Sequence, residues 1–430
     1  MMLTEVESMI RKERGHGDFV YPFYDGYSIA NVAHTVSSLL GIKPSSMPIN
    51  AGLYKGLVDL DDVEKVIAIT IDGFGYRVLQ AVHKEKGFFN AISDKGIAAP
   101  ITSVCPSNTS AGLASISTGM PPQQHGIVEG TIYFKGLGAK PGREGKGPGI
   151  NFFSVPSEET GHYKDAFYSG STIYEELAGE GVASYSVLSS EIADSSYLCL
   201  IKKGSRLKPF RDLSEGASIA GKLLDSEKGM AYINLYIDTF DRSAHKYGPY
   251  SSESIAELKK ISQTLQRELI KRIAPDVAKK TIVMVTSDHG QSNVDKDKIT
   301  YLKRDEKLES AFKVIDGYKI YPSNTPHGML LHLKEGYADE ICTYLSSILG
   351  NTAMVITSND ALRKGLFGKG KPGNNFTQRI GDVLVFPHDN RAVWYLKDDK
   401  SRLAQRGTHG GLNPDDMLSS FAIARIADLR

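Results

Sequence analysis

The sequence has little of three features that mark secreted or membrane-spanning proteins. Only three of its 430 residues are cysteines, and their odd number and wide spacing argue against a disulfide framework. It has no uninterrupted apolar run of about 18 residues, the length that a membrane-spanning helix requires. Residues 1–19 also lack the apolar core of a secretory signal peptide. We therefore expect a cytoplasmic protein that does not span a membrane.

The chain also lacks an excess of charge of either sign. Lys and Arg together number 51 and Asp and Glu 50, which gives a net charge of +1. This balance provides no long-range field that would attract a nucleic-acid polymer or a membrane surface. A small anionic substrate would therefore have to be bound by a local site. The length fits about two or three domains, or one large α/β domain with an insertion.

Short apolar runs rich in β-branched residues alternate with helical patterns along the chain. Such runs predict strands that are buried on both faces of a parallel sheet. The predicted strands are 66–71, 183–188, 232–237, 281–286 and 381–386, and the predicted helices are about 28–41, 171–179, 251–273 and 335–349. Their alternation predicts an α/β fold, in which helices cover both faces of a largely parallel sheet.

The pattern of elements divides the chain into a core and two additions. Residues 1–64 are predicted to form an N-terminal arm packed on the core, and residues 65–294 and 406–430 the catalytic α/β core. Residues 295–405 have their own strand and helix patterns and are predicted to form an inserted, smaller α+β cap. The glycine-rich residues 134–165 are predicted to form a mobile loop near the site.

Three of the predicted strands run into acidic residues. These are Asp72, the pair Asp238 and Asp241, and Asp288, which is followed by His289. A single Asp before Gly is usually a turn former. The carboxyl ends of parallel strands, however, meet at one edge of a sheet, where α/β proteins bind their ligands. Three strand ends of this kind therefore indicate a shared site.

Two more histidines extend this set of potential metal ligands. His245 lies four residues after Asp241, so the two side chains share one face of a helix in a chelating geometry, whereas Asp238 has no histidine at that spacing. His409 lies between glycines that allow a close approach of backbone and metal. Mixed oxygen and nitrogen ligands without cysteine favour Zn²⁺ or Mn²⁺ over Ca²⁺ or Mg²⁺.

Residues 101–119 are predicted to form a strand end, a proline turn and a helix from about 110 to 118. Thr109 would then be the helix N-cap, and for an arbitrary threonine capping alone is the better interpretation. Backbone N–H groups at a helix N-terminus also bind anions. A hydroxyl bound there to a cation would lose its proton easily and act as a nucleophile.

The order of these residues resembles that in the alkaline phosphatase superfamily, and in particular its nucleotide pyrophosphatase/phosphodiesterase branch. The resemblance is carried by CPSNTSAGLASISTGMPPQQHGI (105–127), DRSAHKYGP (241–249), SDHG (287–290) and GTHGG (407–411). It extends from about residue 66 to the C-terminus, and residues 295–405 match only loosely. The resemblance implies an alkaline-phosphatase-like fold and a two-metal hydrolase of small, nucleotide-like phosphodiesters or pyrophosphates.

The resemblance also implies a role for each residue. One divalent ion, Zn²⁺ or Mn²⁺, would be held by Asp241, His245 and His409, and the other by Asp72, Asp288, His289 and the Thr109 hydroxyl. Thr109 would form a covalent phosphoryl intermediate. The branch commonly has an Asn three residues after its Thr, where this chain has Gly112. Asn108 is the candidate to contact the phosphoryl group instead.

Two alternatives remain open from the sequence. The first is a phosphomonoesterase or a phosphoglycerate-mutase-like enzyme of the same superfamily, and the second is a non-catalytic relative that binds phosphate ligands. A monoester dianion needs an additional cationic partner, and residues 101–119 contain no arginine. A diester is therefore the predicted substrate, unless Arg242 or Arg406 turns toward the site.

Overall fold

A computed structural model describes the chain except for residues 133–149, 152–169, 304, 316, 324, 374, 375, 399 and 400. The predicted loop at 134–165 therefore lies outside the described residues, apart from 150 and 151. Within the described part, Cys105 and Cys342 are free thiols. None of the helices described is both long and apolar enough to cross a bilayer.

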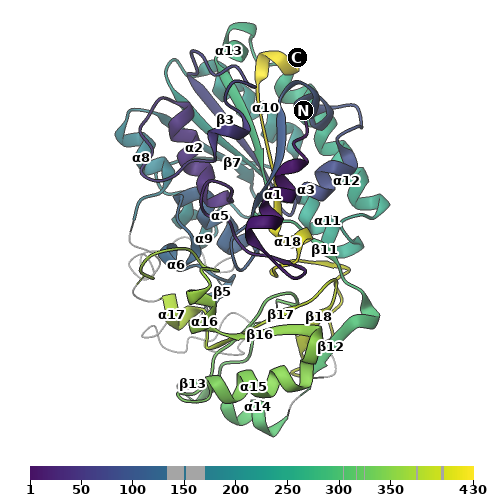
Figure 1. Ribbon diagram of the computed structural model, residues 1–430. Coiled ribbons are helices and arrows are strands. Elements are labelled where there is room, and N and C mark those ends of the chain that lie inside the picture. Colours follow the sequence, from purple (N-terminus) through teal and green to yellow (C-terminus); the bar gives the residue numbers. More distant parts are fainter. Residues whose placement is uncertain are drawn as a thin grey trace.

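A seven-stranded sheet forms the centre of the molecule (Figure 1). Its strands, in spatial order, are β4 (Ile97–Thr102), β20 (Leu418–Arg425), β10 (Thr281–Thr286), β3 (Lys65–Ile71), β9 (Ala231–Ile237), β7 (Ala183–Ser189) and β8 (Arg206–Phe210). The neighbours from β10 to β8 pair in parallel, whereas β20 is antiparallel to both β10 and β4. The prediction of a largely parallel sheet is confirmed.

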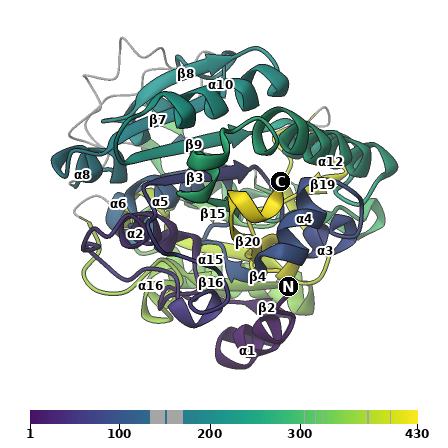
Figure 2. The same ribbon diagram turned by 90° about the horizontal axis from the view of Figure 1, so that it is seen from above.

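Helices cover both faces of this sheet, as predicted (Figure 2). One face carries α4 (Phe88–Lys95), α10 (Leu213–Ser226) and α12 (Ser252–Thr264), and the other carries α2 (Val32–Leu39), α5 (Thr109–Thr118) and α8 (Ile173–Gly179). The helix predicted at 251–273 is α12 continued by a π-helical turn, Leu265–Ile270. The helix predicted at 28–41 is a 3₁₀ turn, Ile29–Asn31, followed by α2.

The sequence predicted the strands β3, β7, β9 and β10 and the end of β4, but it missed β8 and β20. Both edge strands of the sheet contain a proline, Pro100 in β4 and Pro209 in β8. Proline has no N–H group to donate to a neighbouring strand, so it is tolerated mainly in edge strands. It also makes such a strand harder to recognise from the sequence. Bridges to Met2 and Ser28 pair part of the β4 edge with the N-terminal residues.

The strand predicted at 381–386 is present, but its predicted parallel pairing is wrong. It is β17 (Val383–Pro387), and it pairs antiparallel with β15 (Met329–Leu331) and β16 (Ala353–Thr357) in a separate three-stranded sheet. All five residues of β17 are buried. A continuous apolar run indicates a strand that is buried on both faces but does not indicate the direction of its neighbours. Here a small antiparallel sheet buries both faces of the strand.

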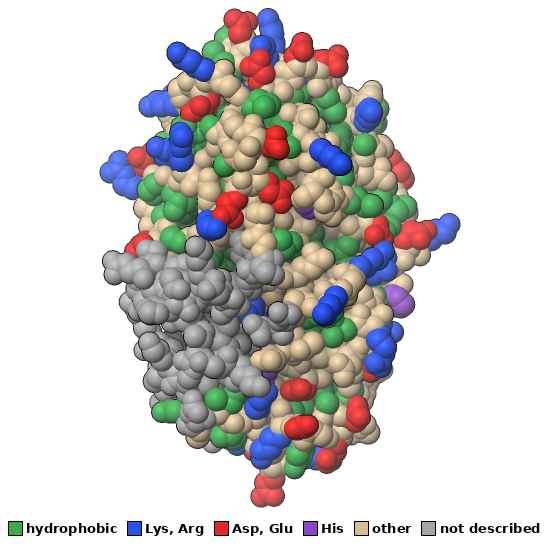
Figure 3. Space-filling view, turned by 90° about the vertical axis from the view of Figure 1, so that its left-hand side faces the viewer, with side chains coloured by type: hydrophobic (Ala, Val, Ile, Leu, Met, Phe, Trp, Pro, Cys, Tyr) green, Lys and Arg blue, Asp and Glu red, His purple; other side chains and the backbone are tan. Residues whose placement is uncertain are grey.

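The three-stranded sheet packs with α14 (Glu306–Ala311) and α15 (Ala338–Leu349) around a hydrophobic cluster of its own, in the lower part of Figure 1. Phe367, Phe376 and Ile380 nevertheless join the main core. The inserted segment is therefore anchored in the core at one side, and the predicted boundaries at 295 and 405 stay predictions. On the face in Figure 3, acidic and basic side chains are interspersed over the described surface, as the net charge of +1 suggests.

Candidate active site

The predicted site residues lie together beyond the carboxyl ends of three neighbouring strands. Asp72 directly follows β3, and Asp288 and His289 follow β10 after one serine. The helix α11 (Thr239–Tyr247) begins two residues after β9 and carries Asp241 and His245. His409 directly follows the short strand β19 (Gly407–Thr408). The order of the strands in the sheet, β10-β3-β9, therefore brings these segments together.

The first cluster, here called the strand-end group, consists of Asp72, Asp288 and His289. The Nε2 atom of His289 lies 3.3 Å from Asp72 Oδ1 and 3.6 Å from Asp288 Oδ2. The Thr109 hydroxyl lies 3.1 Å from the same nitrogen. The three ligand atoms of the group lie within 4.8 Å of one another, so one metal ion could contact all of them.

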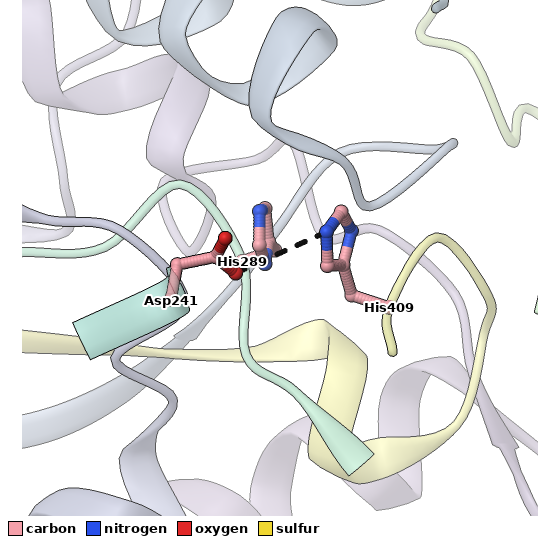
Figure 4. Close-up of side chains that lie close together, drawn as sticks. All are labelled: Asp241, His289 and His409. Carbon is pink, nitrogen blue, oxygen red and sulfur yellow. Dashed lines mark ion pairs between the residues drawn. The ribbon is translucent and has the colours of Figure 1, made fainter. Parts of the chain in front are cut away.

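The second cluster, here called the helix-and-loop group, consists of Asp241, His245 and His409. His245 Nε2 lies 3.3 Å from Asp241 Oδ2, and His409 Nε2 lies 4.0 Å from Asp241 Oδ1. Figure 4 shows His289 beside this group, and Asp241, His289 and His409 also have ligand atoms within 4.8 Å of one another. The stacked rings of His289 and His409 have centroids 3.8 Å apart. The two groups are therefore adjacent, with His289 between them.

Each of the three histidines is oriented by the protein backbone. Their Nδ1 atoms lie 2.8 to 3.2 Å from carbonyl oxygens, which can only accept a hydrogen bond, so each Nδ1 carries the proton. The carbonyls belong to Gly407 for His245, Gly290 for His289 and Ser107 for His409. This arrangement directs Nε2 toward the centre of the site and is typical of metal-binding histidines.

The carboxylates lack the partners that buried charges need. Asp72 Oδ1 and Asp288 Oδ2 are buried and accept no hydrogen bond in the described part of the chain. Burial and the charge of Asp72 raise the pKa of Asp288 to about 7, and the same two causes raise the pKa of Asp241 well above its usual range. Burial opposes protonation of His289, but the adjacent carboxylates of Asp288 and Asp72 raise its pKa. Divalent cations would supply the missing positive charge, so these residues fit a metal site.

Side chains that the sequence analysis missed hold the carboxylates in place. The Tyr236 hydroxyl donates to Asp72 Oδ2, and the Gln291 amide donates to Asp241 Oδ1 over 2.8 Å. Gln291 follows the Asp288-His289-Gly290 motif directly, which is a weak signal, whereas nothing in the sequence marks Tyr236 within its apolar strand. Such outer partners fix the orientation of metal ligands.

Thr109 is the first residue of α5, so the prediction that it caps the helix is wrong by one position. Asn108 is the N-cap: its extended backbone lets Oδ1 accept from the Ala111 N–H over 2.9 Å. The Asn108 amide donates to the Val128 carbonyl over 2.8 Å. Asn108 lines the pocket described below, but these hydrogen bonds commit it to the fold, and its contact with substrate stays a prediction. The Thr109 hydroxyl is left to face His289.

Gly112 allows a close approach of α5 to Asp288. A Cβ atom at this position would lie 2.7 Å from the Asp288 Cβ and 2.8 Å from its carbonyl oxygen. Contacts this short do not occur, so α5 can approach Asp288 only because residue 112 has no side chain. An Asn at position 112 would push the nucleophile helix away from the strand-end group.

A pocket of about 300 Å³ opens beside Thr109 and is lined by residues of both groups. Its lining includes Asp72, Thr109, Asp241 and His409, and further residues that would face a bound substrate: Asn108, Leu113, Glu129, Ile192, Leu198, Asp238, Arg242 and Thr325. Arg242 pairs with Glu191 over 2.7 Å and with Asp238 over 3.2 Å. Arg406 is exposed and is not among these lining residues.

Comparison with known proteins agrees with this geometry. Residues 66–412 match the model of the type I phosphodiesterase / nucleotide pyrophosphatase family. The chain belongs to this family. Venom phosphodiesterase 2 of Crotalus adamanteus is 25% identical over 243 residues, which cover 55% of this chain but only 28% of that protein. Human ectonucleotide pyrophosphatase/phosphodiesterase family member 1 is 24% identical over 240 residues, or 55% of this chain and 24% of that protein.

Solved structures support the fold assignment. Murine ectonucleotide pyrophosphatase/phosphodiesterase 5 aligns with 84% of this chain and 88% of its own, with a TM-score of 0.63 and 18% identity. An inactive form of the same murine protein, in complex with AMP, aligns over the same shares of both chains with a TM-score of 0.61 and 17% identity. The predicted α/β fold and the predicted relationship are therefore confirmed.

Proposed function

We propose that this protein hydrolyses phosphodiester or pyrophosphate bonds of small, nucleotide-like substrates, with Thr109 as the nucleophile. The observation that carries the proposal is the position of the Thr109 hydroxyl, 3.1 Å from His289 Nε2, where the two metal-ligand groups meet. Membership in the type I phosphodiesterase / nucleotide pyrophosphatase family supports the reaction class. The AMP complex of the murine relative supports a nucleotide-like substrate.

The proposed site holds two divalent metal ions, zinc or manganese. Asp72, Asp288, His289 and Thr109 would hold one ion, and Asp241, His245 and His409 the other. The unpartnered carboxylate oxygens and the inward-facing Nε2 atoms support this assignment. Two such ions, when bound, lower the pKa of a hydroxyl nucleophile and neutralise charge on the attacking and leaving oxygens.

The protein residues supply the nucleophile and its alignment. The Thr109 oxygen loses its proton to solvent and forms a bond to phosphorus while the bond to the leaving oxygen breaks. This yields Thr109 esterified to a phosphoryl group that keeps its remaining substituent, and a released alcohol or phosphate. Water then cleaves the Thr109–phosphorus ester. Thr109 is the first residue of α5. The Ala111 N–H donates to Asn108, so the N–H groups of Thr109 and Ser110 are the ones proposed to stabilise negative charge on the phosphoryl oxygens.

Arg242 bears on the choice between diester and monoester. It lines the pocket, as a monoesterase would require, but its guanidinium is paired with both Asp238 and Glu191. A dianionic monoester would have to compete with these two carboxylates for it. This pairing supports the diester as substrate.

The test compares the hydrolysis of thymidine 5′-monophosphate p-nitrophenyl ester with that of p-nitrophenyl phosphate. We expect a higher kcat/KM for the diester, and acid quenching during its turnover followed by peptide mass spectrometry should find a thymidine 5′-phosphoryl group on Thr109. A monoester advantage of about tenfold, or roughly 1.4 kcal/mol, would favour the phosphatase alternative. Binding of AMP without turnover of either substrate would favour the non-catalytic alternative.

A further inference from the structure

Tyr197 is a buried tyrosine whose hydroxyl is bound to the nucleophile helix. It lies in α9 (Ser196–Ile201), and its side chain is fully buried. Its hydroxyl donates to the carbonyl oxygen of Ser110, in the first turn of α5, over 2.5 Å. The two residues are 87 positions apart in the chain. The contact is therefore a tertiary one, and it reaches the turn that carries Thr109.

The hydrogen bond from Tyr197 holds one end of a peptide group whose other end is also held. The Ser110 carbonyl and the Ala111 N–H belong to the same planar peptide. The carbonyl accepts from Tyr197, and the N–H donates to Asn108 Oδ1 over 2.9 Å. A peptide bound at both its oxygen and its nitrogen cannot rotate without breaking one of these bonds. Because the preceding peptide shares the Ser110 Cα atom, this arrangement also restricts the direction of the Ser110 N–H and the position of Thr109.

A second contact fixes α9 against α5 (Figure 1). Lys202 directly follows α9 and is 2% exposed. Its Nζ donates to Ser117 Oγ in the last turn of α5 over 3.2 Å and to Asn234 Oδ1 on β9 over 2.9 Å. Tyr197 also belongs to the same hydrophobic cluster as Leu113 of α5. The α9 segment is thus attached to both ends of the nucleophile helix and to the central sheet, so the Tyr197 hydroxyl has a fixed position.

We propose that Tyr197 is a positioning residue for the hydrolysis reaction. By fixing the peptide between Ser110 and Ala111, it aligns the Thr109 and Ser110 N–H groups with the phosphoryl oxygens. This inference rests on the proposed function, because it assumes that the phosphoryl group attacked by Thr109 faces these N–H groups. Donors that are aligned in advance act most strongly on the transition state, whose charge and geometry they match better than those of the bound substrate. Loss of the Tyr197 hydroxyl should therefore lower kcat and leave KM nearly unchanged.

The test compares Tyr197→Phe with the wild type in the hydrolysis of thymidine 5′-monophosphate p-nitrophenyl ester. The variant keeps the aromatic ring in its hydrophobic cluster and removes only the hydroxyl. We expect kcat to fall about tenfold, equivalent to roughly 1.4 kcal/mol, while KM stays within about twofold of wild type. An unchanged kcat, or a change in KM alone, would overturn the inference.

Two control variants separate a positioning role from general support of the fold. Lys202→Met removes the contact with the last turn of α5 and leaves the first turn bound to Tyr197, so kcat should stay within about threefold of wild type. Tyr185→Phe removes a hydroxyl of β7 that donates to Glu227, and it should leave kcat unchanged. If either control lowered kcat as much as Tyr197→Phe, a general loss of packing would explain the effect and the inference would fail.

Hydrogen exchange in the first turn of α5 provides a measurement that does not depend on turnover. The N–H groups of Ala111 and Gly112 both donate to Asn108. In Tyr197→Phe they should exchange about tenfold faster than in the wild type, as measured by mass spectrometry of a peptide that spans residues 108–113. Unchanged exchange would show that Tyr197 does not fix the peptide and would overturn the inference.

The two measurements also distinguish failure of the inference from failure of the proposed function. A wild-type protein that hydrolyses neither this diester nor p-nitrophenyl phosphate would contradict the proposed function. The exchange rates would then decide whether Tyr197 fixes the first turn of α5, since faster exchange in Tyr197→Phe supports this contact and equal rates overturn it. A wild-type protein that is active, with an unchanged kcat in Tyr197→Phe, would overturn the inference and leave the proposed function intact.

Discussion

The strand-end group and the helix-and-loop group use similar ligands but are held by different means. Asp72, Asp288 and His289 follow strands in the middle of the sheet, and their side chains are at most 5% exposed. Asp241, His245 and His409 come from a helix and from a loop, and their side chains are 12 to 23% exposed.

The hydrogen bonds of the strand-end group are also more buried than those that hold the histidines of the helix-and-loop group. Both the Gly73 and the His289 N–H groups donate to Asp288, and Tyr236 donates to Asp72. The histidines of the helix-and-loop group are held by partly buried bonds, from His245 to the Gly407 carbonyl and from His409 to the Ser107 carbonyl. Ligands on rigid strand ends hold a fixed geometry, whereas ligands on loops can be displaced more easily. We therefore expect the strand-end group to bind its ion more tightly and to exchange it more slowly.

The largest expected effect is at Thr109, where the two groups meet. Thr109→Ala should lower kcat by more than about a thousandfold, because the nucleophile is lost while both groups keep their other ligands. Thr109→Ser retains the oxygen and should keep a measurable rate. Metal analysis of the purified variants is the control, since metal content should not change. Thr109→Ala with more than about a tenth of wild-type activity would exclude the covalent mechanism.

The next largest effect on activity is expected when one predicted ligand from each group is replaced. Asp288→Asn and His245→Asn should each lower kcat/KM by more than the roughly 10–100-fold that loss of an outer partner costs. Because the helix-and-loop group is more exposed, activity of His245→Asn should recover in excess zinc, whereas that of Asp288→Asn should not. Zinc titrations of both variants measure this difference. Equal recovery would show that burial does not separate the two sites.

Metal removal should have a smaller but measurable effect on stability. Three carboxylates share the site, and without cations they repel one another. Ions present at about 1,000 times their Kd stabilise the native state by roughly 4 kcal/mol, so a strong chelator should lower the Tm. Release of metal to the chelator should be biphasic, and His245→Asn should lack the fast phase. An unchanged Tm in protein shown to be metal-free would contradict the cluster.

The smallest expected effect concerns His327, which links the inserted segment to the helix-and-loop group. His327 is fully buried, and its Nδ1 donates to Asp416 Oδ2 over 2.8 Å; the same oxygen accepts from the Gly411 N–H, two residues after His409. His327→Phe should weaken zinc binding by about tenfold, because the loop that carries His409 loses this support. His327→Asn keeps a donor near the Nδ1 position and should restore most of the affinity.

The control for this prediction is His332, another buried histidine of the inserted segment, which follows strand β15 whereas His327 precedes it. His332→Gln should leave zinc affinity unchanged, as measured by competition with a fluorescent chelator. If both His327→Phe and His332→Gln lower the affinity alike, the effect is a general loss of stability, and His327 has no specific positioning role.

The local pattern of the sequence was sufficient to predict the central strands and the ligand motifs. The apolar runs that end at Asp72 and near Asp288 indicate where two strands end. The four-residue spacing of Asp241 and His245 indicates that both side chains lie on one face of a helix. Both patterns depend only on residues that are close together in the sequence, so a single sequence is enough to recognise them. The predicted residues lie together because Asp72, Asp241 and Asp288 follow the central strands β3, β9 and β10. Their roles as ligands stay a prediction.

Only the tertiary structure determined the contacts between segments that are far apart in the chain. The sequence could not reveal that β17 joins a small antiparallel sheet, or that Gly112 is required by its contact with Asp288. Nor could it reveal that Glu129 meets Thr325, 196 residues away. Residue type and local periodicity report how deeply a side chain is buried and which way it faces, but the partner it meets depends on how the whole chain packs.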